Sequence, residues 1–258
     1  MRVEEAVEYL KNISGTNIEF NEDDFVEFDV EDGGIAIAVD GSSVRLFDAY
    51  TFSVYARRVG WVKASEEKLL YKNKGELKID YIFGENADAV NDGRREEEEL
   101  EIAKKFTDNL VMIDGCANIK EKNVVGVSKK SGMKIGNAPL LFVAKKYGDK
   151  IKPGKRWYYQ MNDGVYAVKF HPYSKFAFRV DYYGDDAKEV FSKIASFCSD
   201  ISCLGYPYPL AEVHKMVKID ADEADYLRYS ILHGAVRRGI SMDELENLFY
   251  DYHEYMEG

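Results

Sequence analysis

Two aspartates follow short apolar runs that lie far apart in the chain. Asp40 comes directly after residues 35–39, Asp114 comes directly after residues 110–113, and a glycine follows each aspartate. An apolar run this short predicts a strand that is covered on both faces. A carboxylate at the end of a buried strand carries a desolvation cost that a cation or a donor must offset. The pattern therefore predicts two carboxylates at one edge of a sheet, which is a geometry for binding a metal ion.

A run of four glutamates, residues 96–99, supplies a third candidate carboxylate. Residues 92–109 are expected to be helical, because apolar residues recur every three or four positions from Leu100 onward and define one apolar face. Counting back from Leu100 by three and four residues places Glu97 and Glu96 close to that face. We therefore expect at least one carboxylate of this run to point inward, although a glutamate run is more often a solvated helix surface.

The prediction of a metal site depends on the order of these elements, since an isolated Asp-Gly is most often only a turn. The expected order is a strand ending in Asp40, further strands over residues 44–47 and 51–62, the glutamate helix, and a strand ending in Asp114. This layout resembles the RNase H-like nuclease architecture, a mixed sheet flanked by helices. Hard oxygen ligands without cysteine suit Mg²⁺ or Mn²⁺. In phosphodiester hydrolysis such ions activate a water and stabilise the leaving oxygen.

The rest of the chain predicts an α/β protein with an additional β-rich block and helices at its C-terminal end. The block is expected over residues 157–160, 165–170 and 176–182. The tail is expected to be helical over residues 222–237 and 241–256, and Ser241 with Glu244 form a capping box at the start of the second helix. No linker or repeat divides the chain, so a single domain over residues 1–258 is predicted, with a core over about 30–235.

Composition excludes several classes of protein. The 258-residue chain has a net charge of −11, which opposes generic nucleic-acid binding, although a cation-binding carboxylate cluster itself adds negative charge. Its basic groups are more simply read as solvated surface than as DNA contacts. The three cysteines (Cys116, Cys198 and Cys203) are odd in number and lack Cys-x-x-Cys spacing, which argues against a disulfide framework and a structural zinc site.

The same sequence predicts a soluble protein with no membrane segment. No apolar run reaches the roughly 18 residues that a membrane-spanning helix needs. The first residues, Met-Arg-Val-Glu-Glu, are charged and do not form a signal-peptide core. A cytoplasmic location is the resulting expectation.

Three motifs give the sequence a resemblance to a known family. They are Ala-Val-Asp-Gly-Ser at residues 38–42, Met-Ile-Asp-Gly at 112–115, and Gly-Tyr-Pro-Tyr-Pro-Leu-Ala-Glu-Val-His at 205–214. The third is the most specific, because a Gly-Tyr-Pro-x-Pro-Leu run with a histidine four residues later is improbable by chance. Together with the element order, these motifs resemble the NurA nuclease family of archaea and some bacteria over roughly residues 30–235.

The resemblance implies a function and its partners. NurA proteins are implied to be Mn²⁺-dependent nucleases with an RNase H-like core, acting on single-stranded DNA and resecting duplex ends from the 5′ side. They are implied to work as homodimers docked on the hexameric HerA helicase-translocase in double-strand-break repair by homologous recombination. By this resemblance, Asp40 and Asp114 match the two metal-binding aspartates of the family. His214 matches the histidine of the third motif, and Tyr206 matches the tyrosine eight residues before that histidine. Glu97 is the best match for the helical glutamate, with the other three glutamates of the run as alternatives.

The predicted mechanism follows from these matches. Asp40, Glu97 and Asp114 are expected to hold one or two Mn²⁺ ions, with Mg²⁺ as the other candidate, and His214 is a further ligand or a proton-transfer group. Tyr206 is expected to orient the scissile phosphate or stack on a base; the alternative is that its ring only braces the loop. Two lysines just past residues 123–128, Lys129 and Lys130, are expected to contact phosphates at the mouth of the site.

The sequence departs from the family pattern at two points and leaves two rival functions open. Cys116 and Ala117 follow the second Asp-Gly where a small polar residue is usual, and the chain is compact for the family, which weakens the implied docking on a helicase. One rival function is a non-catalytic adaptor for a DNA translocase, and the other is a nuclease of the same architecture that acts on RNA.

Overall fold

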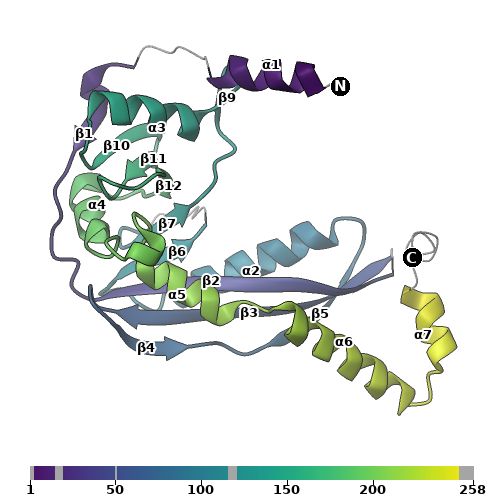
Figure 1. Ribbon diagram of the computed structural model, residues 1–258. Helices are drawn as coiled ribbons and strands as arrows, with labels where there is room; N and C mark the ends of the chain where they lie inside the picture. Colours follow the sequence, from purple (N-terminus) through teal and green to yellow (C-terminus); the bar gives the residue numbers. More distant parts are fainter. Residues whose placement is uncertain (1–2, 15–19, 50, 116–120, 250–258) are drawn as a thin grey trace. The chain divides into compact units, whose positions relative to one another are not determined.

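The computed structural model describes residues 3–14, 20–49, 51–115 and 121–249 (Figure 1). The helices are α1 (Val3–Ser14), η1 (Glu22–Asp24), α2 (Ala87–Ala103), α3 (Leu140–Ile151), α4 (Ala187–Ser196), η2 (Ile201–Cys203), α5 (Tyr208–Val217), α6 (Ala221–Val236) and α7 (Met242–Phe249). The strands are β1 (Phe25–Glu27), β2 (Ala36–Asp48), β3 (Phe52–Ala64), β4 (Leu69–Asn73), β5 (Lys78–Phe83), β6 (Leu110–Asp114), β7 (Val124–Ser128), β8 (Lys134–Ile135), β9 (Ala138–Pro139), β10 (Trp157–Asn162), β11 (Val165–Lys169) and β12 (Phe178–Asp181).

Most of the described strands belong to one mixed sheet, whose order is β1-β10-β11-β12-β7-β6-β2-β3-β4, with β5 on β3. Strand β6 pairs in parallel with both β2 and β7, and the strands from β7 to β1 pair antiparallel. The predicted α/β class, a large mixed sheet flanked by helices, is therefore confirmed. The chain divides into two compact units. The single domain expected over residues 1–258 stays a prediction.

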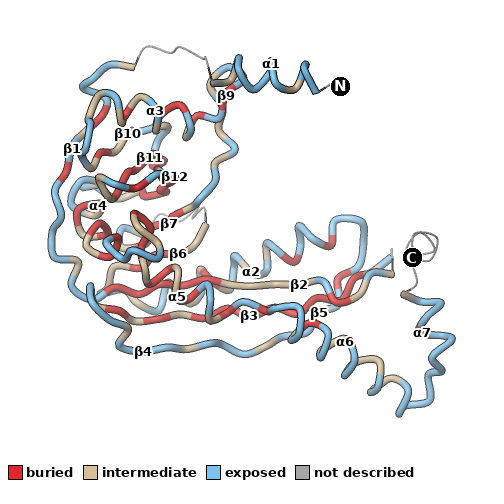
Figure 2. Tube along the Cα trace, in the orientation of Figure 1, coloured by how far each residue is buried: buried red, intermediate tan, exposed pale blue. Residues whose placement is uncertain are grey.

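Unit 1 comprises Met1–Val39, Val62–Lys72 and Ala103–Glu212. Its sheet is covered on both faces, because alternate residues of β10 pack in opposite directions. Trp157 is fully buried in a cluster that includes Ala144 of α3. The next residue, Tyr158, packs on Phe191 of α4 with ring centroids 5.2 Å apart. Figure 2 shows the buried residues of this unit concentrated along the strands and in α4.

Unit 2 comprises Asp40–Trp61, Asn73–Ile102 and Val213–Gly258. Alternation along β3 again decides which helix each side chain meets. Val54 faces a cluster that includes Ala224 of α6, whereas Tyr55 packs with Ala87 of α2. Two buried arginines of β3 pair with carboxylates on these helices; the pairs are Arg57–Glu98 on α2, at 2.8 Å, and Arg58–Glu223 on α6.

One strand prediction is wrong. Strand β2 does not end at Asp40 but continues to Asp48 through the glycine and serines that follow the aspartate. Asp40 can lie within a buried strand because its carboxylate is hydrogen-bonded to the Gly41 N–H and to His214. Asp114, in contrast, is the last residue of β6, as expected.

Several other elements match their predictions and a few were missed. Strands β3, β6 and β10 to β12 and helix α6 lie within a few residues of their predicted bounds, whereas α2 begins at residue 87 and ends at residue 103, five and six residues earlier than predicted. Strand β4 lies where no element was predicted. The capping box of α7 is confirmed, since Ser241 Oγ accepts a hydrogen bond from the Glu244 N–H at 3.2 Å. Cys116, Ala117 and the last residues of the helix predicted to reach 256 lie outside the described residues.

Among the described helices, none combines the length and the apolar character that crossing a lipid bilayer requires.

Candidate metal centre

Asp40 and Asp114 occupy equivalent positions on neighbouring strands. Strands β2 and β6 are parallel, and Val39 is paired with Ile113, so the next residue of each strand is one of the two aspartates. The pairing places both carboxylates on the face of the sheet opposite the valine and isoleucine side chains. Asp40 is buried, with 3% of its surface exposed, and 13% of the Asp114 side chain is exposed. The predicted juxtaposition of the two aspartates is therefore present.

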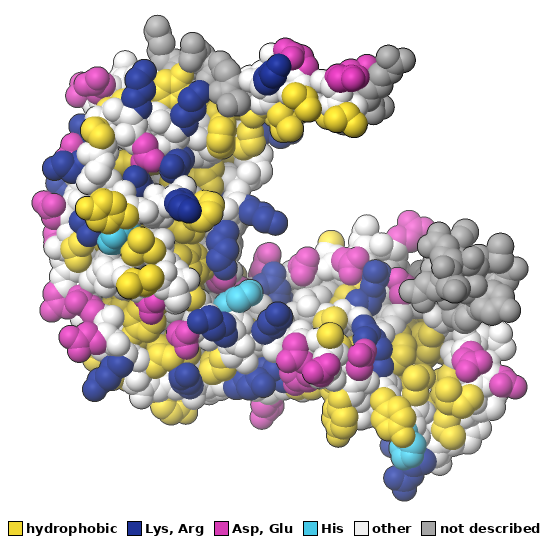
Figure 3. Space-filling view, in the orientation of Figure 1, with side chains coloured by type: hydrophobic (Ala, Val, Ile, Leu, Met, Phe, Trp, Pro, Cys, Tyr) yellow, Lys and Arg dark blue, Asp and Glu magenta, His cyan; other side chains and the backbone are white. Residues whose placement is uncertain are grey.

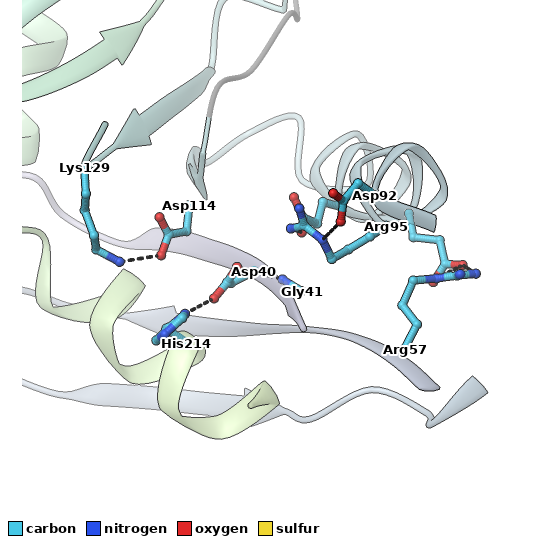
Figure 4. A network of polar contacts seen from close by, with 10 residues as sticks. Asp40, Gly41, Arg57, Asp92, Arg95, Asp114, Lys129 and His214 are labelled. Carbon is cyan, nitrogen blue, oxygen red and sulfur yellow. Dashed lines mark hydrogen bonds and ion pairs between the residues drawn. The ribbon is translucent and has the colours of Figure 1, made fainter. Parts of the chain in front are cut away.

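His214 completes this group of side chains. Its Nδ1 lies 2.8 Å from Oδ2 of Asp40, and the other Asp40 oxygen accepts a hydrogen bond from the Gly41 N–H at 2.8 Å (Figure 4). Helix α5 carries the histidine, and its buried stripe, Leu210, Val213 and Val217, turns His214 to the edge of the apolar face. One possible ligand atom from each of Asp40, Asp114 and His214 lies within 4.8 Å of the others.

A fourth titratable group, Glu99 of α2, lies near Asp40. Glu99 is 3% exposed, and its Oε1 accepts a hydrogen bond from Arg95 Nη1 at 2.7 Å. Burial raises the pKa of the Glu99 carboxyl to about 8; the nearby Arg95 opposes this rise and the negative charge of Asp40 adds to it. Burial lowers the pKa of Arg95, but the carboxylates around it, chiefly Glu99, raise the pKa above its usual value overall.

Gly41 permits this approach between the strand and the helix. A Cβ atom at position 41 would lie 2.6 Å from Glu99 Oε1 and 2.7 Å from Arg95 Cγ, closer than real Cβ contacts. The glycine after Asp40 therefore has a packing role rather than a turn role. From the sequence, Gly41 was noted only as the glycine that follows Asp40, and Arg95 was not singled out; the Arg-x-x-x-Glu spacing of residues 95–99 is the signal that could have found the ion pair.

The inward orientation expected for Glu97 is wrong. Glu97 is exposed, as is Glu96, while Glu98 bonds to Arg57 and Glu99 is buried. The buried stripe of α2 follows a four-residue spacing, and its most buried members are Ala87, Asn91, Glu99 and Ala103. Leu100, from which the phase was counted, is only half-buried. The alternative Glu99 is thus the one glutamate of this run that points into the protein.

Lys129 joins the second aspartate to the Tyr-Pro motif. Its Nζ lies 2.9 Å from Oδ2 of Asp114 (Figure 4). The same Nζ lies 4.6 Å from the centroid of the Tyr206 ring. Tyr206 is 5% exposed and packs on Phe178 at a centroid distance of 5.2 Å. A nucleobase cannot stack on a ring buried in this way, so the stacking role expected for Tyr206 is not supported. Its contacts instead support bracing of Lys129.

Lys130 has a different environment from its neighbour. Its backbone exchanges hydrogen bonds with the Ser128 hydroxyl, which donates to the Lys130 carbonyl at 2.9 Å and accepts from the Lys130 N–H at 3.3 Å. These bonds fix the backbone just past β7, and Lys130 itself is exposed. Its predicted contact with phosphate stays a prediction.

The side chains present fit a hard divalent cation. Two carboxylates and an imidazole within 4.8 Å supply oxygen and nitrogen donors without sulfur, a set that suits Mg²⁺ or Mn²⁺. Asp40 is held at both oxygens, by Gly41 and by His214, which fixes the direction in which its carboxylate faces. Oriented ligands of this kind are what a metal site requires.

Comparison with known proteins identifies the fold. No protein-family model and no curated protein sequence matches this chain. The solved structure of the NurA nuclease from Sulfolobus solfataricus matches with a TM-score of 0.68 and 15% sequence identity, over 93% of this chain and 96% of that chain. This chain has the NurA fold.

Two further solved structures match at lower TM-scores than the NurA structure. Human ENDOV has a TM-score of 0.42 and 13% identity, over 81% of this chain and 94% of that chain. The Endonuclease V of Ciona intestinalis, in complex with DNA that contains an inosine, has a TM-score of 0.44 and 14% identity, over 88% of this chain and 100% of that chain. The NurA likeness concerns the fold, and function depends on the side chains that the fold brings together.

Proposed function

We propose that this chain is a divalent-metal-dependent nuclease that hydrolyses phosphodiester bonds of DNA. The observation that carries the proposal is the grouping of Asp40, Asp114 and His214 within 4.8 Å. Two carboxylates this close repel each other, and the Lys129 ammonium beside Asp114 offsets only part of their charge, so the pair favours a further cation. The NurA fold of the chain, which it shares with a solved nuclease, supports the same function.

Asp40 and Asp114 would hold the ion, with Glu99 as the third carboxylate in place of the expected Glu97. A bound Mn²⁺ or Mg²⁺ supplies Lewis acidity to the scissile phosphate and lowers the pKa of a water that attacks it. Arg95 lies 2.7 Å from Glu99 and opposes the rise in its pKa, and a cation bound nearby would favour the charged carboxylate further. One or two ions are compatible with this set of carboxylates.

Each aspartate has a basic partner: His214 pairs with Asp40, and Lys129 pairs with Asp114. His214 is hydrogen-bonded to Asp40 and 54% of its side chain is exposed, so it can orient that carboxylate and exchange a proton with solvent or substrate. Lys129 lies beside Asp114 and 49% of its side chain is exposed, which leaves its ammonium within reach of an incoming phosphate. Lys130, also exposed, is proposed to contact the strand further out.

The finer parts of the proposal concern substrate and partners. We propose Mn²⁺ as the working ion, cleavage of single-stranded DNA and 5′-to-3′ resection of duplex ends, and a place in cytoplasmic double-strand-break repair. We also propose a homodimer that works with a HerA-type hexameric ATPase. Exposed apolar side chains support protein contacts; on α1 they include Val3 and Leu10, which are 80% and 62% exposed.

The central experiment measures cleavage of labelled single-stranded DNA in Mn²⁺ by the wild-type protein and by Asp40→Asn and Asp114→Asn. Each variant should lose at least about a hundredfold in rate, because each removes a charged oxygen ligand. Asp108→Asn, which changes an exposed aspartate just before β6, is the matched control and should cleave normally. Substrates labelled at the 5′ or the 3′ end report the polarity.

Other outcomes separate the rival functions. Cleavage that persists in EDTA contradicts the metal mechanism. Calorimetric titration that finds no Mn²⁺ binding, together with no cleavage, favours the non-catalytic adaptor. Faster cleavage of RNA than of DNA of the same sequence favours the RNA-directed nuclease. Size-exclusion chromatography and a binding assay with a purified HerA-type ATPase test the two proposed assemblies.

A further inference from the structure

The loop between β11 and β12 in unit 1 exposes two aromatic rings. Tyr173 is 82% exposed and Phe176 is 66% exposed, and a third exposed residue, Lys175, lies between them in the sequence. Isolated exposed apolar residues need no explanation, but two aromatic rings beside a cation in one short loop form a surface that a ligand could cover. The proposed metal centre does not use either ring.

This loop is held in a defined conformation by its own hydrogen bonds. The buried Ser174 hydroxyl donates to the Phe176 carbonyl at 2.9 Å and accepts from the Phe176 N–H at 3.1 Å. The Ser174 N–H donates to the His171 carbonyl at 3.0 Å, and the Tyr173 N–H donates to His171 Nδ1 at 3.3 Å. Burial, with the nearby Arg156, lowers the pKa of His171, which keeps this nitrogen available as an acceptor. These bonds hold the loop backbone in place, and the Tyr173 ring lies beside the His171 ring with centroids 5.8 Å apart.

Contacts within unit 1 connect the loop to the candidate metal centre. A Cβ at Gly205 would lie 2.3 Å from Ser174 Oγ, and Gly205 has a φ of +89°, so only glycine fits against the loop here. The next residue, Tyr206, lies beneath Lys129, which is bonded to Asp114. The Gly-Tyr-Pro motif thus lies between the aromatic loop and the aspartate of β6.

Basic groups border the same loop. A pocket beside Pro172 is lined by Lys155, Arg156 and Lys188, together with the carboxylates of Glu27 and Asp29. Glu27 is engaged by Lys152 and Lys155 at 3.5 and 3.6 Å. With Lys175, the cations around the loop outnumber these carboxylates. Figure 3 shows exposed hydrophobic side chains next to Lys and Arg side chains over the region of β12 and α4.

We propose that residues 171–176 form a binding site for a single-stranded polynucleotide, in which Tyr173 and Phe176 stack on bases and Lys175 contacts phosphate. Stacking on aromatic rings grips single strands without reading their sequence, and lysines beside the rings follow the backbone. Duplex DNA offers no free base faces for such rings. The inference rests on the proposed function for its class of ligand and extends it with a site outside the metal centre.

Binding is measured apart from cleavage, by fluorescence anisotropy of a labelled oligothymidylate in EDTA with every variant built on Asp40→Asn. Tyr173→Ala and Phe176→Ala should each raise the Kd by about fivefold or more. The matched control is the pair Tyr81→Ala and Phe83→Ala on β5, whose rings are 59% and 77% exposed, and it should leave the Kd unchanged. Tyr173→Trp should retain tight binding, which separates loss of a stacking ring from loss of the fold.

Salt dependence separates charge from stacking. Lys175→Gln should lower the slope of log Kd against log salt by about 0.7, the value for one phosphate contact on a single strand. The alanine variants of the rings should weaken binding with the slope unchanged. An oligouridylate tested alongside tells whether the site accepts RNA as well as DNA, and binding of either strand through the rings supports the proposal.

Several outcomes overturn the site or separate it from the nuclease proposal. A wild-type protein that cleaves DNA while both ring variants bind as tightly as the control overturns the site and leaves the nuclease proposal intact. Ring-dependent binding by a wild-type protein that cannot cleave supports the site and overturns the nuclease proposal. Unchanged DNA binding with an altered elution volume of the ring variants overturns the site in favour of a protein contact.

Discussion

Nδ1 of His214 lies 2.8 Å from Oδ2 of Asp40, although the histidine side chain is 54% exposed and the aspartate side chain only 5%. One partner therefore faces solvent while the other is fixed inside the sheet. The remaining Asp40 oxygen is held by the Gly41 N–H. A buried carboxylate constrained in this way presents one orientation to a cation, and the imidazole beside it is the group that can still exchange protons.

The first prediction concerns His214. His214→Gln keeps a polar side chain near Asp40 but cannot exchange a proton, so cleavage in Mn²⁺ should fall by about a hundredfold. His233→Gln, which changes an exposed histidine on α6, should cleave at the wild-type rate. Rates are compared at saturating DNA, with the melting temperature recorded for each variant. Wild-type activity in a folded His214→Gln protein would remove the histidine from the mechanism.

The second prediction separates the glutamates of α2. Glu99→Gln should weaken Mn²⁺ binding in a calorimetric titration and lower cleavage at least about tenfold, because Glu99 is buried beside Arg95 and lies near Asp40. Glu97→Gln changes an exposed residue two positions away and should affect neither. The reverse result, with Glu97→Gln inactive and Glu99→Gln active, would restore the assignment made from helical spacing.

Glu97 and Glu99 also show which parts of the site could be predicted from sequence patterns and which could not. Asp40 and Asp114 could be placed together from sequence because parallel pairing of two buried strands requires only apolar runs of the right length. The inward position of Glu99 could not be predicted in this way, because the orientation of the helix was inferred from its apolar residues alone. The buried stripe of α2 contains Asn91 and Glu99, which are tolerated there through hydrogen bonds and ion pairs with residues distant in sequence or one turn away.

Two further features depended on tertiary contacts that no local pattern contains. Strand β2 continues past Asp40 because the carboxylate is compensated by His214, a residue 174 positions away. The Tyr206 ring is buried against Phe178 and lies beneath Lys129, so a tyrosine in a proline-rich loop became a packing residue. The motif located the position of Tyr206 in the chain, but only the packing around it shows which role its ring can have.

The third prediction concerns Lys129. Its ammonium lies 2.9 Å from Oδ2 of Asp114 and therefore competes with a metal ion for that oxygen. Lys129→Met should raise the affinity for Mn²⁺ in a calorimetric titration while it increases the KM for DNA, because a phosphate contact is lost. Lys130→Met, beside it, should increase the KM alone. Weaker Mn²⁺ binding in Lys129→Met would mean that the lysine supports the site rather than competing for it.

The last prediction is a dependence of stability on pH that comes from Glu99. Burial raises the pKa of this carboxyl from 4.5 to about 8, so between these two pH values the native protein binds more protons than the unfolded chain. Stability therefore falls as the pH rises through this interval. In EDTA, the free energy of unfolding from urea titrations should decrease by a few kcal/mol between about pH 5 and pH 8.

Glu99→Gln should flatten this decrease, since the amide does not titrate, and Glu97→Gln should leave it unchanged. Excess Mn²⁺ should also flatten it in the wild-type protein, because a nearby cation favours the charged carboxylate. A decrease of equal size in Glu99→Gln would assign the pH dependence to other groups and would contradict a strongly raised pKa of the carboxyl at this position.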